Sequence, residues 1–168
     1  MKTLVLWACA AMLALGAVSC GNKQSETKLD PELEKQLGSL KTAAEEGAEF
    51  IAAQLKADPA LKKTKTGLVY KITEPGAGEL FKADQTVKVV YTGKHTSGEV
   101  FDSSNGEAVD FPLQNVVAGF REMITMMRPG AKAYCIIPGD LAYGPQGNRG
   151  IAPNETLVFE IETQGLAE

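Results

Sequence analysis

The sequence predicts an α+β domain in which several β-strands surround one short helix. Three segments, 67–72, 86–93 and 156–162, alternate apolar and polar side chains, which is the period of a half-buried strand. A fourth segment, 115–127, repeats its apolar residues at helical spacing. Loops rich in Gly and Pro separate these segments, so the strands and the helix are expected to form one domain.

The first twenty residues have the pattern of a secretory signal. An apolar run at 3–17 follows the positive charge of Lys2 and is too short for a comfortable transmembrane helix. The run ends in Ala-Val-Ser-Cys, which resembles the lipobox of bacterial lipoproteins, in which the cysteine, here Cys20, is acylated. The first position is Ala instead of the usual Leu, and an ordinary cleavage site is the alternative. We expect a lipoprotein signal peptide at 1–19 and a flexible polar tether at 20–29.

A helix is expected over residues 30–58. Asp30 and Pro31 have the residue types of an N-cap and a first turn, and Asp58 precedes Pro59, which excludes the α conformation there. Two interpretations of its apolar seam are open. It pairs with a second copy and makes a homodimer through residues 30–58, or it lies on the chain's own domain. The seam residues recur every three or four positions: Leu33, Leu37, Leu40, Ala44, Gly47 and Ile51.

The rest of the chain supplies the folded body. Another apolar strand is expected at 131–139, ending at Pro138-Gly139, and its Cys135 is expected to be a buried, inert thiol. Within 86–93 we expect Val87, Val89 and Tyr91 to share one face. On the last strand Leu157, Phe159 and Ile161 share a face, and on the helix Val116, Phe120, Met123, Ile124 and Met127 do so.

Composition and motifs exclude several classes of function. A net charge of -4 gives no basic surface for nucleic acid. The sequence contains no CxxC pair, HExxH, Walker loop or GxSxG elbow, so no activated nucleophile is indicated. His95 is the only histidine and lies in a predicted turn, and we expect neither a metal site nor a role for it. The site chemistry must therefore come from other residues.

Four motifs, in order and spacing, resemble the FKBP family of peptidyl-prolyl cis-trans isomerases. They are VKVVYTGKHTSGEVFDSS, DFPLQNVVAGFREMI, GDLAYG and IAPNETLVFEIE. The similarity covers residues 66–163 and implies an FKBP-like antiparallel sheet wrapped around one short helix, with an isomerase domain at 64–168. The upstream helix followed by TKTGLVYKI is similar to the exported macrophage infectivity potentiator subgroup, whose N-terminal helices dimerise.

The resemblance also implies a proline pocket. Asp102, Tyr143 and Ile151 correspond to catalytic positions, with the main-chain N–H at Ile151 holding the substrate carbonyl. Many relatives have Trp at the pocket floor where this chain has Phe120, which predicts lower activity and lower macrolide affinity. No cofactor is implied. From the pattern alone, the aromatic side chains would be assigned to a core, and only the resemblance places them in a pocket. The implied substrate-binding residues are Tyr91, Phe101, Phe111, Val116, Val117, Phe120 and Phe159.

Asp102 has two interpretations. An aspartate followed by two serines at the end of a strand is typical of an Asx turn. The family resemblance instead places Asp102 in the pocket, hydrogen-bonded to the Tyr91 hydroxyl, where its charge orients nearby dipoles without transferring a proton. On this interpretation, replacing Asp102 lowers turnover and leaves the fold intact.

The expected function is prolyl isomerisation that assists the folding of exported proteins. Alternatives are a non-catalytic chaperone or binding module for proline-containing segments, and an adaptor whose helix docks a membrane partner. The expected partners are proline-containing polypeptides, macrolides such as FK506, and the membrane through the lipid anchor. Gly21 after the cysteine favours the outer membrane, facing the periplasm of a bacterial cell envelope.

Overall fold

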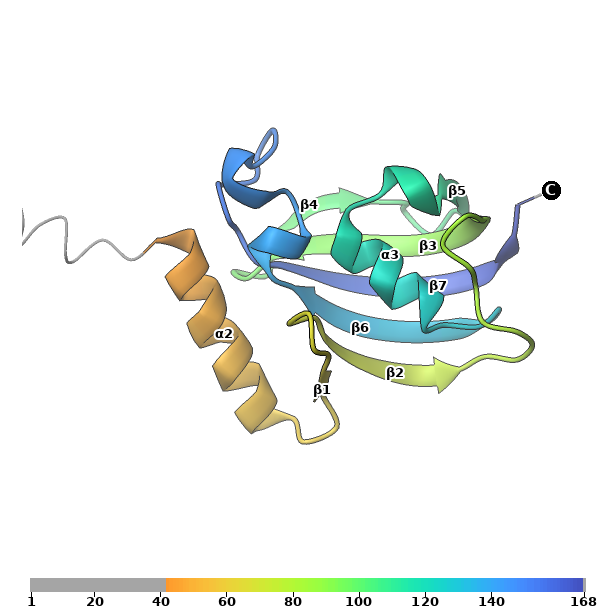
Figure 1. Cartoon of the computed structure of the whole chain (residues 1–168), viewed down its shortest axis with the longest axis horizontal. Helices are drawn as coiled ribbons and strands as arrows, with labels where there is room; N and C mark the ends of the chain where they lie inside the picture. Colours follow the sequence, from red (N-terminus) through yellow and green to blue (C-terminus); the bar gives the residue numbers. More distant parts are fainter. Residues whose placement is uncertain (1–41, 168) are drawn as a thin grey trace, which may run out of the picture. The chain divides into compact units, whose positions relative to one another are not determined.

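The computed structural model describes residues 42–167 of the 168-residue chain. The predicted signal peptide, Cys20, the tether and the first part of the expected helix lie outside the described residues. The described part begins with a helix, α2 (Ala43–Ala57), and continues into a seven-stranded sheet and a second helix, α3 (Ala118–Thr125), as Figure 1 shows. Within this part, no helix is long and apolar enough to cross a membrane.

The sheet is antiparallel at every paired edge and mixes strands that are distant in sequence. Its order is β1-β2-β6-β7-β3-β4, with β5 paired to the other half of β3. This order brings residues from the middle of the chain next to its C-terminal strand. The strands are β1 (Lys62–Lys63), β2 (Val69–Pro75), β3 (Thr86–His95), β4 (Val100–Ser103), β5 (Val109–Pro112), β6 (Ala131–Ile137) and β7 (Leu157–Leu166).

The main core lies between this sheet and α3. Val87 and Val89 of β3 are fully buried, as the alternation predicts. From α3 and the residues after it, four apolar side chains of the predicted helical face enter the same cluster: Phe120, Met123, Ile124 and Met127. Leu157, Phe159 and Ile161 of β7 are buried with them. The predicted α+β fold, an antiparallel sheet around one short helix, is confirmed.

The helix around α3 is shorter than the sequence predicts. Instead of one helix over 115–127, a 3-10 turn, η1 (Leu113–Asn115), is followed by Val116 and Val117 in extended conformation, with ψ angles of 162° and 150°. Two adjacent β-branched residues are stiff and favour an extended backbone. The break turns the chain just before α3 and leaves both valines beside the hollow described below.

Helix α2 begins at its own capping box. The sequence predicts an uninterrupted helix over 30–58, but Thr42 is extended, with φ −75° and ψ 154°. Its hydroxyl accepts a hydrogen bond from the Glu45 N–H at 3.3 Å, and the Thr42 N–H donates to the Glu45 carboxylate at 2.8 Å. At the other end α2 stops at Ala57, as the proline after Asp58 predicts.

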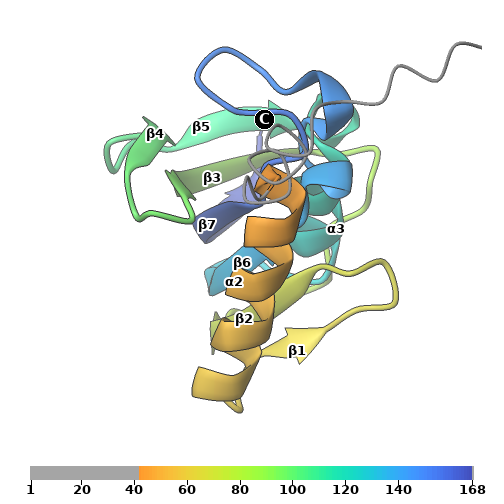
Figure 2. The ribbon, with the colours of Figure 1, turned by 90° about the vertical axis from the view of Figure 1, so that its left-hand side faces the viewer.

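The described part of the helix seam packs on the chain's own domain. Ile51 belongs to a second, smaller buried cluster, separate from the one that contains the α3 side chains. Its other members are Leu61, Val69, Ile136 and Val158. Gly47 faces Thr156, and a Cβ at Gly47 would lie 2.0 Å from the Thr156 hydroxyl oxygen. Figure 2 shows α2 running past the ends of β6 and β7. For Gly47 and Ile51 the structure therefore supports the second interpretation, a helix on its own domain.

The close approach at Gly47 predicts that a larger residue undocks α2. We expect Gly47→Leu to destabilise the protein by about 1 to 3 kcal/mol, the usual cost of overpacking a tight contact. Chemical denaturation of the variant measures this loss. Ala52→Leu, on the exposed side of the same helix, is the matched control. Equal stability of the two variants would show that α2 does not depend on this contact.

Candidate active site

A hollow of about 150 Å³ opens between α3, the strands β3 to β5 and the end of β7. Its lining contains all of the residues that the family resemblance places in a pocket except Ile151, and it adds Asn115, which has no signal in the sequence. Two larger hollows, of about 380 and 430 Å³, lie elsewhere. The first has no aromatic ring in its lining, and the second has two, Tyr91 and Tyr134. The lining residues are Tyr91, Phe101, Asp102, Phe111, Asn115, Val116, Val117, Phe120, Tyr143 and Phe159.

Phe120 forms the floor of this pocket. Its ring centroid lies 6.2 Å from that of Tyr91, 5.7 Å from that of Phe111 and 5.5 Å from that of Phe159. The pairs with Tyr91 and Phe159 meet edge to face, a favourable arrangement of aromatic quadrupoles. Phe120 and Phe159 are buried, whereas Tyr91 and Phe111 are half-buried. The same rings therefore complete the core and expose an apolar surface, so both interpretations of the aromatics hold.

One glycine allows the rings on the opposite wall to meet. Phe101 and Phe159 are edge to face, with centroids 5.7 Å apart. A Cβ at Gly93 would lie 2.7 Å from the Phe101 ring and 2.9 Å from the Phe159 ring. Because real Cβ atoms essentially never approach so closely, a side chain at this point of β3 would push the rings apart.

Asp102 stands at the exposed rim of the pocket, on β4. One carboxylate oxygen accepts a hydrogen bond from the Tyr91 hydroxyl at 2.7 Å, and the other accepts one from the Ser103 N–H at 2.9 Å. The turn that follows is closed by Ser103, whose hydroxyl accepts from the Asn105 N–H at 3.0 Å. The Ser104 N–H, which an Asx turn would direct to Asp102, donates instead to the Tyr91 carbonyl. The structure therefore excludes the Asx-turn interpretation.

The Tyr91 hydroxyl is held in its protonated form. Burial raises the pKa of this hydroxyl well above its ordinary value, and the hydrogen bond to Asp102 and the charge of Asp102 raise it further. Tyr143, a second pocket hydroxyl, also contributes to the raised pKa of Tyr91. At neutral pH the Tyr91 hydroxyl is therefore a permanent donor that fixes the Asp102 carboxylate.

The raised pKa predicts a late tyrosine titration. A group whose folded pKa lies above its unfolded value stabilises the fold below the unfolded pKa, here about 10, and loses that contribution as the pH rises through the folded pKa. We expect absorbance titration of tyrosinate to show late steps for Tyr91 and for Tyr134, whose pKa burial also raises. Tyr91→Phe should remove one of them. If this variant retains every late step, the pKa of Tyr91 is not raised.

Ile151 does not supply the free donor that the resemblance implies. Its side chain is buried in the core cluster, and its N–H donates to the Asn148 carbonyl at 2.8 Å. The Asn148 N–H returns a hydrogen bond to the Ile151 carbonyl at 3.0 Å, which closes a narrow loop. An alternative main-chain donor lies at Val117, the N-cap residue of α3, because the first N–H groups of a helix have no acceptor within it.

Cys135 agrees with its sequence-based expectation, whereas His95 does not. Cys135 is fully buried on β6, and burial raises the pKa of its thiol, as expected of an inert cysteine. His95 is the last residue of β3, and its side chain is only 18% exposed because it pairs with Glu155. The expectation that His95 lies in a turn is therefore wrong. Among residues 42–167, no group of three or more His, Cys, Asp and Glu side chains is placed to hold a metal ion.

The domain combines an antiparallel sheet around one helix with a pocket of aromatic rings that carries one carboxylate at its rim. Residues 78–164 match the family model described as FKBP-type peptidyl-prolyl cis-trans isomerase. The match covers half of the chain, and the chain belongs to this family.

Individual relatives agree with this assignment. A probable FKBP-type peptidyl-prolyl cis-trans isomerase of Haemophilus influenzae is 43% identical over 73% of this chain and 52% of its own length. The peptidyl-prolyl cis-trans isomerase Mip of Coxiella burnetii is 40% identical over 70% of this chain and 52% of its own. The crystal structure of FkpA from Escherichia coli, 36% identical, superposes with a TM-score of 0.71 over 80% of this chain and 62% of that one. The chain thus spans about half the length of the curated relatives it matches.

Proposed function

We propose that this protein is a peptidyl-prolyl cis-trans isomerase that turns the peptide bond before proline in the ring-lined pocket. The observation that carries this proposal is the set of six aromatic side chains around one hollow, with Asp102 fixed at its rim by Tyr91. Membership of the FKBP-type family supports it.

The reaction needs no bond to be made or broken by the protein. Rotation about the bond before proline faces a barrier of about 20 kcal/mol because amide resonance must be disrupted. A twisted amide has a less polar carbonyl than a planar one. A dry, apolar pocket therefore favours the transition state over the solvated ground state.

Different pocket residues would have different roles in this reaction. The buried ring of Phe120 would receive the proline ring, with Phe159 beside it. Asp102, with its carboxylate fixed by the Tyr91 hydroxyl, would orient the amide dipole as it turns. The N–H of Val117 and the hydroxyl of Tyr143 are the donors that would hold the substrate carbonyl or the freed lone pair of the prolyl nitrogen. None of these roles requires proton transfer.

The direct test is an isomerisation assay on the chain from residue 25 onward. We expect a proline-containing peptide to isomerise faster with the protein present, and FK506 to inhibit this acceleration by occupying the same pocket. The return of the cis and trans forms of the peptide to equilibrium should be measured without a coupled protease, so that peptide cleavage cannot affect the rate. A rate equal to the uncatalysed one would reject the enzymatic proposal.

The second candidate is a non-catalytic module that holds proline-containing segments. One observation favours it: the Ile151 N–H is already used within its loop. The Phe120 floor, for which the family resemblance predicts lower activity, agrees with it. In this case the peptide would bind the pocket and shift its resonances in NMR spectra, with no gain in isomerisation rate. Measuring peptide binding by NMR together with the isomerisation rate therefore separates the two candidates.

We further propose that the protein acts on exported polypeptides while anchored to the bacterial outer membrane by a lipid on Cys20. Support comes from the apolar run at 3–17 and the Ala-Val-Ser-Cys ending. Metabolic labelling with palmitate should mark the protein, and Cys20→Ala should abolish the label. Labelling of the variant equal to that of the natural chain would contradict the anchor.

We also propose that residues 30–58 pair with a second copy of the chain and form a homodimer. Gly47 and Ile51 are covered by the chain's own domain, so pairing would rest on Leu33, Leu37 and Leu40. Sedimentation of the non-lipidated protein with and without residues 25–58 tests it. We expect a dimer that becomes a monomer on truncation, and identical monomers would refute the pairing.

A further inference from the structure

The only histidine of the sequence belongs to a pair that joins β3 to the stem of the long loop before β7. His95 Nδ1 lies 2.5 Å from Glu155 Oε1, and the two side chains are only 18% and 17% exposed. Such shielding limits the competition of water for these groups and strengthens a charge-assisted hydrogen bond. The pair is therefore more than a screened surface contact.

Glu155 also contacts the main chain of the loop. Its second carboxylate oxygen accepts a hydrogen bond from the Ala152 N–H at 2.7 Å. One residue before Glu155, the Asn154 N–H donates to the Gly144 carbonyl at 2.8 Å, which closes the base of the loop next to Tyr143. The stem that carries a pocket hydroxyl is thus tied, through one carboxylate, to the end of β3.

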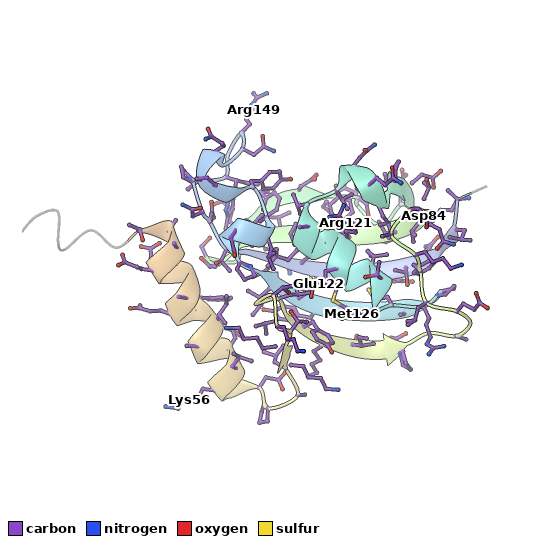
Figure 3. All side chains as sticks on the ribbon, viewed as in Figure 1. Lys56, Asp84, Arg121, Glu122, Met126 and Arg149 are labelled. Atoms are coloured by element: carbon purple, nitrogen blue, oxygen red, sulfur yellow. The ribbon has the colours of Figure 1, made fainter. Side chains whose placement is uncertain are left out.

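Beyond this stem, the loop is held by the buried side chain of Ile151 and by the two hydrogen bonds between Ile151 and Asn148, whereas its tip is exposed. Figure 3 shows Arg149 projecting from its tip, away from the sheet. Residues 148–150 are exposed, and the glycines at 144, 147 and 150 have positive φ angles of 61°, 62° and 79°. A segment with few buried contacts is readily displaced, so its position depends on the attachments at its base.

The same histidine also supports a pocket wall. The centroid of its ring lies 5.2 Å from that of Phe101. Phe101 is half-buried and lines the pocket. His95 therefore touches a wall residue directly and reaches the Tyr143 stem through Glu155, although it does not line the pocket itself.

We propose that His95 and Glu155 are positioning residues that hold two sides of the pocket, the Phe101 wall and the loop stem beside Tyr143, in the geometry that binds a prolyl segment. This inference rests on the proposed function for its readout in turnover. The pair acts on binding of the substrate in both its planar and twisted forms. Its loss should therefore raise KM and leave kcat nearly unchanged.

The central experiment compares four variants with the natural chain in the isomerisation assay. We expect Glu155→Ala, which removes the hydrogen bonds to His95 and to the Ala152 N–H, to raise KM by about threefold to tenfold, with kcat nearly unchanged. Glu155→Gln keeps an oxygen for the Ala152 N–H and should recover most of the loss. His95→Ala should also raise KM. The double variant should raise KM by less than the product of the two single changes, because both remove the connection between His95 and Glu155.

A neighbouring ion pair provides the matched control. Lys94 Nζ lies 2.8 Å from Glu160 Oε1 and joins β3 to β7, but neither residue lines the pocket. We expect Lys94→Ala and Glu160→Ala to leave KM unchanged. Equal rises in KM for both pairs would show a general loss of strand pairing and overturn the proposal. So would an unchanged KM in both Glu155→Ala and His95→Ala.

A second readout separates this inference from the proposed function. Hydrogen exchange of the Ala152 amide, followed by NMR, should accelerate in Glu155→Ala and stay slow in Glu155→Gln. If the natural chain shows no turnover, the enzymatic proposal fails, and the dissociation constant of a prolyl peptide then replaces KM in the same comparison. If Glu155→Ala does not fold, His95→Ala decides. Unchanged peptide affinity in His95→Ala would then overturn the positioning role.

Discussion

Replacing Asp102 by alanine is expected to lower kcat/KM for a prolyl peptide by about tenfold to a hundredfold, the range for losing a charged hydrogen-bonding group at a reacting dipole. The side chain is at the exposed rim and its two hydrogen bonds join it only to Tyr91 and Ser103. No buried group loses apolar contact. We therefore expect the fold and the denaturation midpoint to change little, with the loss concentrated in turnover.

Variants at the same position separate charge from shape. Asp102→Asn keeps an acceptor for the Tyr91 hydroxyl and should retain more activity than Asp102→Val, which removes the acceptor at similar size. Asp110→Ala is the matched control, because Asp110 is an exposed aspartate of the neighbouring β5 that does not line the pocket. Unchanged turnover in purified Asp102→Ala would reject a role for this carboxylate in the reaction.

Removing the pocket floor should damage stability and turnover together. Phe120→Ala is expected to cost about 3 to 5 kcal/mol of unfolding free energy, because a buried ring leaves a cavity among its neighbours. Phe120 is 4% exposed and meets the rings of Tyr91, Phe111 and Phe159. Those rings would lose their common partner, and turnover should fall even in the fraction that remains folded.

A second core truncation distinguishes the two effects. Met127, which follows α3, is fully buried in the same cluster but does not line the pocket. Met127→Ala should lose about 2 to 5 kcal/mol of stability while kcat/KM of the folded protein stays near that of the natural chain. If both variants lose turnover in proportion to stability, the pocket floor has no specific role. Denaturant titration and activity at a temperature where both are folded give the comparison.

The sequence by itself determined the fold class, the buried faces and most of the pocket. Alternation along 86–93 and 156–162 identifies the inward residues because successive side chains of a strand point to opposite faces. Val87, Val89 and Phe159 are buried accordingly. The pocket residues are identified by the family motifs, since apolar patterning alone does not distinguish a ring in the core from one lining a hollow.

Only the tertiary structure decided where hydrogen-bonding groups find their partners. The Ile151 N–H is used by Asn148, His95 reaches Glu155 sixty residues away, and Ser103 closes the turn that Asp102 appeared to close. In each case a polar group has several acceptors or donors within reach along the chain. The antiparallel pairing of β3 with β7 brings His95 to Glu155, whereas the geometry of a local turn sets the partners of Ile151 and Ser103. Hydrogen bonds depend on distances and angles that periodicity does not contain.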